Sequence, residues 1–545
     1  VVEKESDPRG AHPEPRNTMA GKDLSQIEAE AREFITKRKR NLINLLSSSI
    51  VRLTGPSGVG KSSLMRDLQQ DRGNGIEVYN ELPLLAAWSQ DKDPTKQKIL
   101  FIDEANIDDM HYTIFAALLR AAATNNWPAT ILYDGQLIAL TKQHKVVFAG
   151  NPITYGGGRS EQKLFTDYQV PTFEMQDFKA EYIYQKLLKE ALFDQVKFEA
   201  LDLLKDQFQD AFLEHCQQLI YGYFLKNQRA RDEGRLNQAE TVRELQAYAL
   251  DYLVSEIVKE RPSLALPLPE ELRSESYVTT LTTKPIERQI NRCLTIRKLQ
   301  REGILPPAAG LPGIFLEGGS GTGKSSIIEA MTINEYRAGN FIKIDASIPP
   351  QEKIRLLTEA FEHGKIVQID EINSCIEDGG LEKVLNAVLT GYHPETGKLA
   401  AKPGFLLVAS ANKASMEGRS IIGPALRHRM HCPKVPELND FKQQDIEKIV
   451  GHWRQQISQS DIDRQKVQLI TTEQQEFELQ QIAEKFYQTI QKGEGNLRDL
   501  KKIMEEMMKD KSLTINEKQK LLDKPGSTLR WPSVSLTRRI GGSSR

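Results

Sequence analysis

Apolar positions along the chain alternate between short continuous runs and longer stretches with helical spacing. From Asp23, the segment DLSQIEAEAREFITKRKRNLINLL repeats apolar residues three and four positions apart, which predicts a helix. The run SIVRLT predicts a short strand, and it leads through a glycine-rich loop into a second helix-forming stretch. Residues 1–22 are rich in proline, glycine and charge, so we expect a flexible lead-in there.

The same order of elements returns after residue 276. IERQINRCLTIRKLQ predicts a helix, PPAAGLPG a break, and IFLEG a strand that enters a second glycine-rich loop. Both halves then carry an apolar strand ending in two acids (KILFIDEAN, KIVQIDEIN) and another ending in asparagine (KVVFAGN, FLLVASAN). Both close on a helix-rich stretch with an arginine (ETVRELQAY, EGNLRDLKK). Features repeating in one order indicate two copies of one domain plan.

The two glycine-rich loops, GPSGVGKSSLM and GGSGTGKSSII, match the pattern GxxxxGK[ST] between a predicted strand and a helix. Glycines let the backbone N–H groups wrap around phosphate oxygens, the lysine reaches the terminal phosphates, and the next serine coordinates Mg²⁺. The predicted phosphate-binding residues are Gly55, Gly58, Gly60, Lys61, Ser62 and Ser63 in the first copy, and Gly318, Gly321, Gly323, Lys324, Ser325 and Ser326 in the second.

The acid pairs end strands that run downstream of these loops. Asp103 and Asp370 are placed to hold Mg²⁺ together with the loop serines, and Glu104 and Glu371 to activate a water molecule as general bases. An Asp-Glu pair after a strand can also simply cap the next helix.

Asparagine ends the following strand in each copy, at Asn151 and Asn412. A neutral amide at this height of the sheet can orient the attacking water or hold the terminal phosphate. The alternative is a plain turn residue, which the Asn-Pro sequence at 151–152 would also fit.

With these motifs in this order, the chain resembles the AAA+ ATPases over roughly residues 45–255 and 300–510. Between acid pair and asparagine, the first copy has ATILYDGQLIALTKQHKVVFAGNP, in which Asp-Gly joins two apolar runs and predicts a hairpin. The second copy has LTGYHPETGKLAAKPGFLLVASAN there. An insert at this point is similar to the helix-2 hairpin of the dynein-related, midasin-like and MoxR-like branch.

The resemblance implies an α/β fold: two tandem P-loop modules, each a parallel-sheet α/β core with a helical lid. The expected domains are a lead-in (1–22), first core (23–172), first lid and linker (173–275), second core (276–436), second lid (437–523) and a basic tail (524–545). The stretch from about residue 174 to 240 is longer than a minimal lid and has room for an extra helical element.

The resemblance also implies arginines that complete a site. Arg159, Arg419 and Arg429 are candidate arginine fingers, and Arg243 and Arg498 match the lid arginine called sensor 2. Arg429 lies in a segment similar to the family's ALxxRF text, which the first copy lacks. Surface arginines on helices are common, so a structural role is the alternative.

The resemblance implies a Mg²⁺- and ATP-dependent hydrolase that works within a ring of AAA+ modules and remodels protein or ribonucleoprotein complexes. A nucleotide-gated scaffold, the ATPase core of a larger protein and a nucleic-acid translocase are the alternatives. With 73 basic and 74 acidic residues, the net charge of −1 argues against nucleic acid as the direct substrate.

Compartment and cofactor class follow from simpler features. No apolar run reaches the ~18 residues of a membrane helix, so we expect no membrane partner and a cytoplasmic, or in a eukaryote nuclear, location. The four cysteines are far apart in sequence, which argues against a zinc site or a disulfide framework. The missing initiator Met suggests a piece of a longer chain or a processed product.

Overall fold

The structure is a computed structural model of the whole chain. It describes residues 19, 21–56, 58–71, 73, 75–80, 84–106, 112–151, 160–175, 177–235, 239–307, 309–376, 380–413, 422–463 and 472–509. The predicted lead-in (1–22) lies mostly outside these residues, and the predicted basic tail (524–545) lies entirely outside them.

The chain folds into two compact units, and each is described by itself. Unit 1 comprises Val1–Leu268, Ile286–Glu317 and Met331–Lys434, and unit 2 comprises Pro269–Pro285, Gly318–Ala330 and Val435–Arg545. Unit 1 therefore contains both predicted acid pairs and the first glycine-rich loop, while the second glycine-rich loop belongs to unit 2.

The described strands of the first copy form a five-stranded parallel sheet in the order β2-β3-β6-β1-β7. Its strands are β1 (Ile50–Thr54), β2 (Ile76–Asn80), β3 (Gln97–Ile102), β6 (His144–Gly150) and β7 (Thr172–Glu174). Since β3 and β6 are parallel neighbours, the sequences that end in the acid pair and in asparagine reach the same sheet edge. Both strands are almost wholly buried, as their continuous apolar runs predict.

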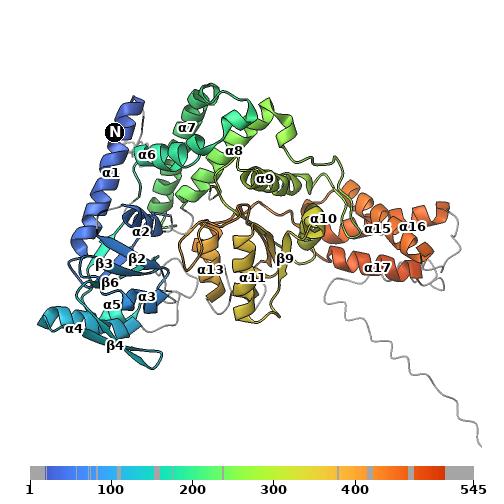
Figure 1. Cartoon of the computed structure of the whole chain (residues 1–545). Coiled ribbons are helices and arrows are strands. Elements are labelled where there is room, and N and C mark those ends of the chain that lie inside the picture. The colour runs from blue at the N-terminus through green and yellow to red at the C-terminus, as the bar shows by residue number, and fades with distance from the viewer. Residues whose placement is uncertain are drawn as a thin grey trace, which may run out of the picture. The chain divides into compact units, whose positions relative to one another are not determined.

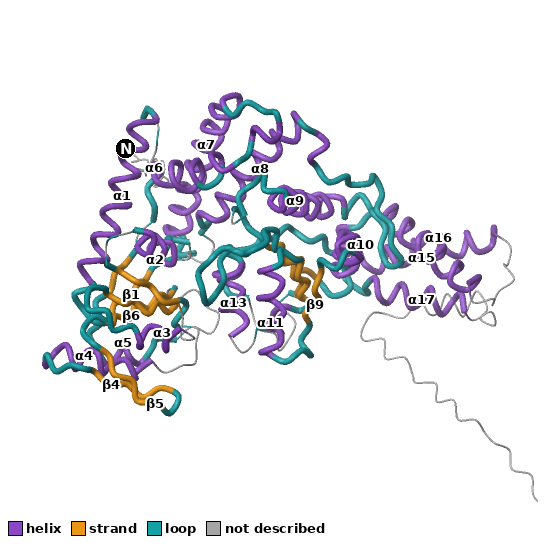
Figure 2. Tube along the Cα trace, viewed as in Figure 1, coloured by secondary structure: helices purple, strands orange, loops and turns teal. Residues whose placement is uncertain are grey.

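The predicted hairpin is confirmed. Strands β4 (Ala129–Tyr133) and β5 (Gln136–Leu140) pair antiparallel. The turn residues Asp134 and Gly135 have φ of 47° and 73°, the left-handed conformations that a two-residue hairpin turn requires. Figure 2 shows this hairpin standing apart from the parallel strands of the first sheet.

The corresponding stretch of the second copy differs. It forms a tight turn, closed by bonds from Gly397 N to His393 O (2.9 Å) and from His393 N to Lys398 O (2.8 Å). The described residues there contain no paired strands. Pro394 and Pro403 interrupt this stretch, and proline cannot donate to a strand ladder.

Helices surround the first sheet and continue into the predicted lid. The helix predicted from Asp23 is α1 (Leu24–Leu45), and Asp23 caps it by accepting from Gln26 N at 2.8 Å. The long α7 lies in the stretch that was expected to hold an extra helical element. The helices are α1, α2 (Lys61–Gln70), α3 (Leu85–Gln90), η2 (Tyr112–Phe115), α4 (Ala116–Thr124), α5 (Lys163–Asp167), α6 (Ala180–Tyr182), η4 (Ile183–Glu190), η5 (Phe193–Gln195), η6 (Phe198–Leu201), α7 (Asp206–Asp232), α8 (Val242–Glu260) and η8 (Pro262–Leu264).

The second copy builds a four-stranded parallel sheet in the order β8-β11-β10-β9. Its strands are β8 (Gly313–Gly318), β9 (Phe341–Ile344), β10 (Ile366–Ile369) and β11 (Leu406–Asn412). Figure 1 shows α11 and α13 side by side next to this sheet. The helices are α9 (Lys284–Arg301), α10 (Lys324–Arg337), α11 (Pro350–Glu362), α12 (Ile372–Cys375), α13 (Gly380–Val388) and α14 (Pro424–Arg427). The chain therefore has an α/β fold with parallel sheets.

The C-terminal part of unit 2 is helical. It contains η9 (Leu438–Asp440), α15 (Gln443–Asp463), α16 (Thr472–Gln491) and α17 (Leu497–Lys509). Their apolar faces share a core that includes Trp453, Phe486 and Leu500.

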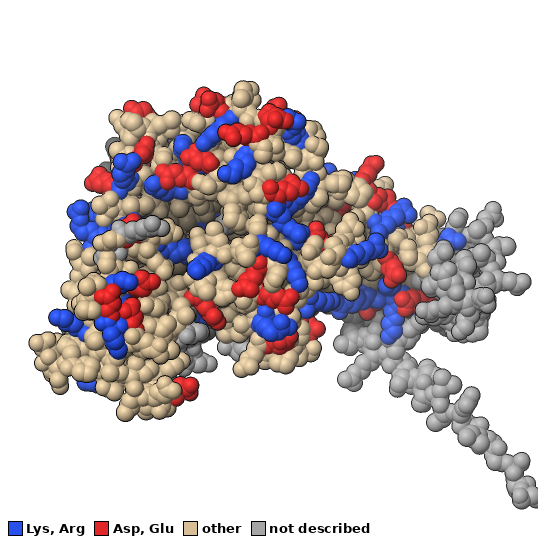
Figure 3. Space-filling model, in the orientation of Figure 1, with Lys and Arg blue, Asp and Glu red and all other residues tan. Residues whose placement is uncertain are grey.

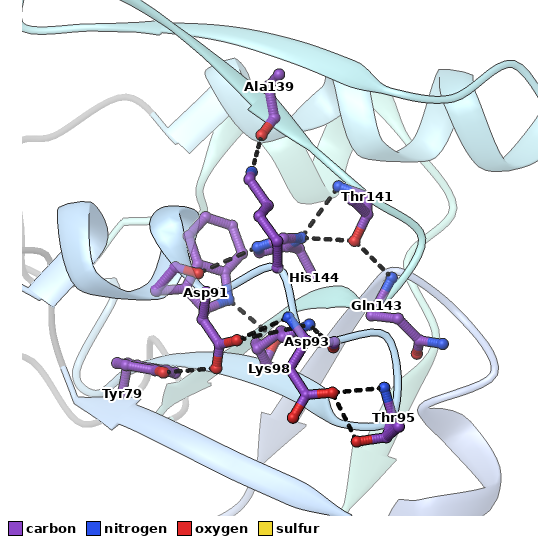
Figure 4. A network of polar contacts seen from close by, with 11 residues as sticks. Tyr79, Asp91, Asp93, Thr95, Lys98, Ala139, Thr141, Gln143 and His144 are labelled. Atoms are coloured by element: carbon purple, nitrogen blue, oxygen red, sulfur yellow. Dashed lines mark hydrogen bonds and ion pairs between the residues drawn. The ribbon is translucent and has the colours of Figure 1, made fainter.

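A buried polar network occupies the amino-terminal end of the first sheet (Figure 4). Lys98 and His144 are both fully buried. His144 Nε2 bonds Trp88 O at 3.1 Å, and its Nδ1 accepts from Thr141 N at 3.0 Å. Lys92 Nζ reaches Ala139 O of the hairpin at 2.6 Å. The network joins α3, β6 and the hairpin at the end of the sheet opposite the predicted site.

None of the described helices combines the length and the apolar character needed to cross a membrane. On the face drawn in Figure 3, basic and acidic side chains are interspersed.

Candidate functional site

The first glycine-rich loop connects β1 to α2 through conformations that favour glycine. Gly58 and Gly60 have φ of +84° and +85°. A Cβ at Gly60 would lie 2.6 Å from Phe178 Cζ, and one at Gly55 would lie 2.7 Å from Met175 O. Strain and lack of space both require glycine here, and the loop has the tight curvature of a phosphate-binding loop.

The lysine of this loop is buried and held by oxygen atoms. Lys61 Nζ donates to Gly55 O at 2.9 Å and to Pro56 O at 3.0 Å. It also donates to Asn151 Oδ1 at 2.7 Å. Because β1 and β6 are paired neighbours, the fold brings the predicted lysine and the predicted strand-end asparagine into direct contact.

The acid pair joins the same cluster. Ser62 Oγ donates to Asp103 Oδ2 at 2.5 Å, so the two predicted Mg²⁺ ligands lie side by side. Asn151 Nδ2 donates to Glu104 Oε1 at 3.0 Å. Glu104 is 3% exposed and has a φ of 49°, a conformation that costs energy for a residue with a side chain. Such strain clusters at functional sites.

Two arginines from outside the first core approach these acids. Arg429, which follows α14 in the second copy, places Nη2 at 3.6 Å from Glu104 Oε1, and both side chains are nearly inaccessible. Arg243 is the second residue of α8. Its Nη1 is buried and has no hydrogen-bond partner among the described residues.

The balance of charge in this cluster is positive. Burial lowers the pKa of Lys61 to about 8; Glu104 and Asp103 oppose the shift, and Arg243 and Arg429 add to it. Burial, with Arg429 nearby, also lowers the pKa of Arg243 to about 9. Three cations thus face two carboxylates in a desolvated space, which favours binding of a polyanion.

Side chains of α8 tie this cluster together. A Cβ at Gly58 would lie 2.7 Å from the Cβ of Thr241, which caps α8. Thr241 N donates to Glu244 Oε2 at 2.6 Å, and His428 Nδ1 lies 3.2 Å from the same oxygen. The loop, the start of α8 and the residue before Arg429 therefore form one continuous set of contacts.

A cavity of about 380 Å³ opens beside these residues. Ser62, Asp103 and Glu104 line it from the first copy, and α11, α13, the turn at 390–397 and Arg429 line it from the second. Its volume falls within the roughly 300–1,000 Å³ that is usual for ligand sites.

The strand ends of the second copy repeat part of this geometry. Glu371 has a φ of 51°, and Asn412 Nδ2 donates to Glu371 Oε1 at 2.6 Å. Both copies therefore have a glutamate in the left-handed backbone conformation that accepts a hydrogen bond from the strand-end asparagine.

Asp370 has different neighbours from Asp103. It accepts from Ser410 Oγ and from Gln368 Nε2, both at 3.0 Å. Lys343 Nζ lies 3.2 Å from its other oxygen. Burial alone would raise the pKa of Asp370, but the hydrogen bonds from Gln368, Ser410 and Lys343 hold it below its usual value.

The second glycine-rich loop, in unit 2, has the same internal contacts as the first. Lys324 Nζ donates to Gly318 O at 3.0 Å and to Gly319 O at 2.7 Å. Gly321 and Gly323 have φ of +71° and +88°. Ser325 and Ser326 lie in the first turn of α10.

The lid contact of this loop also repeats. A Cβ at Gly321 would lie 2.8 Å from the Cβ of Asn496, the residue before α17, as Thr241 lies against Gly58. Arg498, the second residue of α17, donates its backbone N–H to Asn496 Oδ1 at 2.9 Å. Its side chain is exposed.

Some of the predicted site residues are not part of the cluster that the structure describes. Arg159 and Arg419 lie outside the described residues. Ser63 is on α2, where its Oγ accepts from Arg66 Nη2 at 3.1 Å. The described residues contain no group of three or more His, Cys, Asp or Glu suited to hold a metal ion, although a Mg²⁺ bound through one carboxylate, a serine and phosphates needs no such group.

Two residues near the acid pairs were not predicted. Asn386 interrupts the apolar face of VLNAVL in α13 and lines the cavity, and Lys343 contacts Asp370. A polar residue within an apolar helical stripe was the available signal for Asn386. Comparison of the sequence with models of known protein families gave no match, and neither did comparison with curated proteins.

Proposed function

We propose that the chain is a Mg²⁺-dependent ATPase made of two tandem AAA+ modules, whose first site is completed by Arg429 of the second module. The observation that carries the proposal is the contact of Arg429 with Glu104, within the cluster that also holds Lys61 and Asn151. An arginine from a second module beside the catalytic glutamate is what hydrolysis between modules requires.

The residues present fit Mg²⁺ and a triphosphate. The buried Nη1 of Arg243 lacks a partner among the described residues, and the loop glycines leave no room for side chains. Ser62 and Asp103 would hold Mg²⁺, which neutralises charge on the phosphates when bound. Lys61 would bind the terminal phosphates, since it is buried and the acid pair is the negative charge that acts on it among the described residues.

In this mechanism, Glu104 accepts the proton of the attacking water, and Asn151 fixes the carboxylate through the bond from its amide. Arg429 stabilises negative charge that develops on the terminal phosphate. In the nucleotide-free cluster it contacts Glu104, so binding would draw it from the carboxylate toward the phosphate. Ring assembly and remodelling of protein or ribonucleoprotein complexes follow from the resemblance to AAA+ proteins alone.

The test measures phosphate release by the full chain carrying Lys324→Ala, which leaves the first site intact. Because Arg429 lies on the same chain as Lys61, turnover per chain at saturating Mg-ATP should stay constant on dilution. Lys61→Ala should abolish it. Absence of triphosphate binding would overturn the proposal, and turnover that falls on dilution would place the arginine on another chain. Turnover equally slow in wild type and Glu104→Gln would favour a nucleotide-gated scaffold.

A further inference from the structure

One wall of the cavity at the first site is a single face of α13, a helix of the second copy. Gly380, Lys383, Val384 and Ala387 lie three or four residues apart on this wall, with Asn386 beside them and Thr390 just beyond the helix end. Ser62, Asp103 and Glu104, which belong to the terminal-phosphate and Mg²⁺ end of the proposed site, line the same cavity. The helix and the proposed phosphate position therefore share one cavity.

Asn386 is the unexplained residue on this face. It is 4% exposed, and neither Oδ1 nor Nδ2 has a hydrogen-bond partner among the described residues. Buried amides are nearly always hydrogen-bonded, so one that has both atoms unsatisfied and lines a cavity points to a ligand. Its neighbours across the cavity select the kind of ligand, because Arg429 and Ser62 suit a phosphate.

We propose that Asn386 is a nucleotide-binding residue acting from the second copy, whose Nδ2 donates to the terminal phosphate of a triphosphate bound at Lys61. This inference rests on the proposed function and adds a second contact from the same module that supplies Arg429. A diphosphate lacks the group that Asn386 contacts. The residue thereby makes the first site distinguish triphosphate from diphosphate across the module boundary.

The experiment compares Asn386→Ala with its parent, both as full chains carrying Lys324→Ala. Titrations with fluorescent ADP and with a fluorescent non-hydrolysable ATP analogue, each with Mg²⁺, give two affinities. Loss of one hydrogen bond to a charged phosphate should weaken triphosphate binding about tenfold, and diphosphate binding by less than about twofold.

A matched control is Asn373→Ala. Asn373 is also buried in the second copy and has an unsatisfied Oδ1, but it does not line the cavity. Both affinities should stay unchanged in this variant. A second readout is thermal unfolding without nucleotide: because Asn386 pairs with no described residue, Asn386→Leu should unfold no earlier than the parent.

The outcomes separate the two proposals. If the parent binds no triphosphate, the proposed function fails. If the parent binds and Asn386→Ala weakens both nucleotides equally, or neither, the assignment of Asn386 is overturned. Should the alanine variant misfold, the isosteric Asn386→Asp decides the question: a carboxylate facing phosphate must weaken triphosphate more than diphosphate, and equal affinities overturn the assignment.

Discussion

The two acid pairs of unit 1 make a natural comparison, since the aspartate, the glutamate and the strand-end asparagine occur twice in nearly the same sequence. In both, the glutamate adopts a left-handed conformation and accepts a bond from the asparagine of the neighbouring strand. Backbone geometry at the strand ends is therefore a property of the repeated plan. It does not depend on the side chains that differ.

The aspartates have diverged in their surroundings. Asp103 accepts a bond from Ser62, and Asp370 accepts one from Gln368 and has Lys343 beside it in its own sheet. The first copy has apolar Phe101 where the second has Gln368. A cation already beside the aspartate competes with Mg²⁺ for it, so the comparison predicts that the first site turns over faster.

The largest effect on turnover should come from replacing Arg429, the arginine that the second copy contributes to the first site. In the Lys324→Ala chain, Arg429→Ala should lower turnover by about 10³-fold or more, since it removes the arginine of the second copy that lies beside Glu104. Steady-state phosphate release measures it. Arg427→Ala is the matched control: Arg427 pairs with Glu317 at 2.7 Å, away from the cavity, and its loss should cost only a few-fold. Similar losses in both variants would contradict a finger role.

The sequence anticipated much of this site and left other parts open. Lys61, Asn151 and Glu104 were predictable because each sits at a fixed place relative to a strand end, and parallel strands bring those ends together. The Asp-Gly hairpin was predictable because its turn depends on two local residues.

Contacts between the copies were not predictable. Arg429 was one of three candidate fingers; its segment is similar to the ALxxRF text, but its approach to Glu104 depends on how the second core packs beside the first. The role of Asn386 was not predictable either. Its burial, its lack of a described hydrogen-bond partner and its place at the cavity all depend on the folded structure. The engagement of Asp370 by Lys343 depends on the register of β9 against β10.

Exchanging each glutamate for its amide tests the asymmetry directly. Glu104→Gln should lower total turnover by about 10²-fold or more, the usual contribution of a general base. Because a 10²-fold fall leaves the second site only about 1% of the total, Glu371→Gln should leave total turnover almost unchanged. Phosphate release by the two variants and the double variant gives the split between sites. Equal losses would show that the surroundings of Asp103 and Asp370 do not decide the rates.

The pKa of Lys61 predicts a pH dependence of binding at the first site. Burial lowers this pKa to about 8 in the free protein, so the lysine is cationic below that pH and loses its charge above it. Affinity for a non-hydrolysable ATP analogue in the Lys324→Ala chain should therefore fall about tenfold between pH 7 and pH 9. Lys61→Arg keeps its charge and should show a flatter profile, and a parallel fall in both would exclude Lys61 as the cause.

Removing the cation that competes with Mg²⁺ for Asp370 should lower the Mg²⁺ requirement of the second site. In a Glu104→Gln chain, where the second site dominates, Lys343→Ala should lower the Mg²⁺ concentration for half-maximal turnover by about threefold, a small effect because exposed ion pairs contribute about 1 kcal/mol or less. Lys365→Ala is the control, since Lys365 pairs with Glu359 at 3.0 Å. An unchanged Mg²⁺ requirement would mean that Lys343 moves aside at no cost.

The last effect concerns stability instead of turnover and lies at the opposite end of the first sheet, where the second copy has Phe405 in place of His144. Burial, with Lys92 and Lys98 nearby, lowers the pKa of His144 to about 4. Its neutral form is the one that fits, because Nδ1 must accept from Thr141 N.

Since the folded pKa lies below the unfolded value of about 6.5, the stabilisation is complete above pH 6.5 and is lost as pH falls toward 4. We expect a loss of about 2 kcal/mol, seen as a fall in the melting temperature between pH 7 and pH 4.5. His144→Gln stays neutral and can still bond Trp88 O, so its melting temperature should fall less over that range. Equal falls in melting temperature would mean that other groups cause the acid sensitivity. The polar end of the first sheet would then add no pH dependence, and in this respect it would not differ from the apolar end of the second sheet.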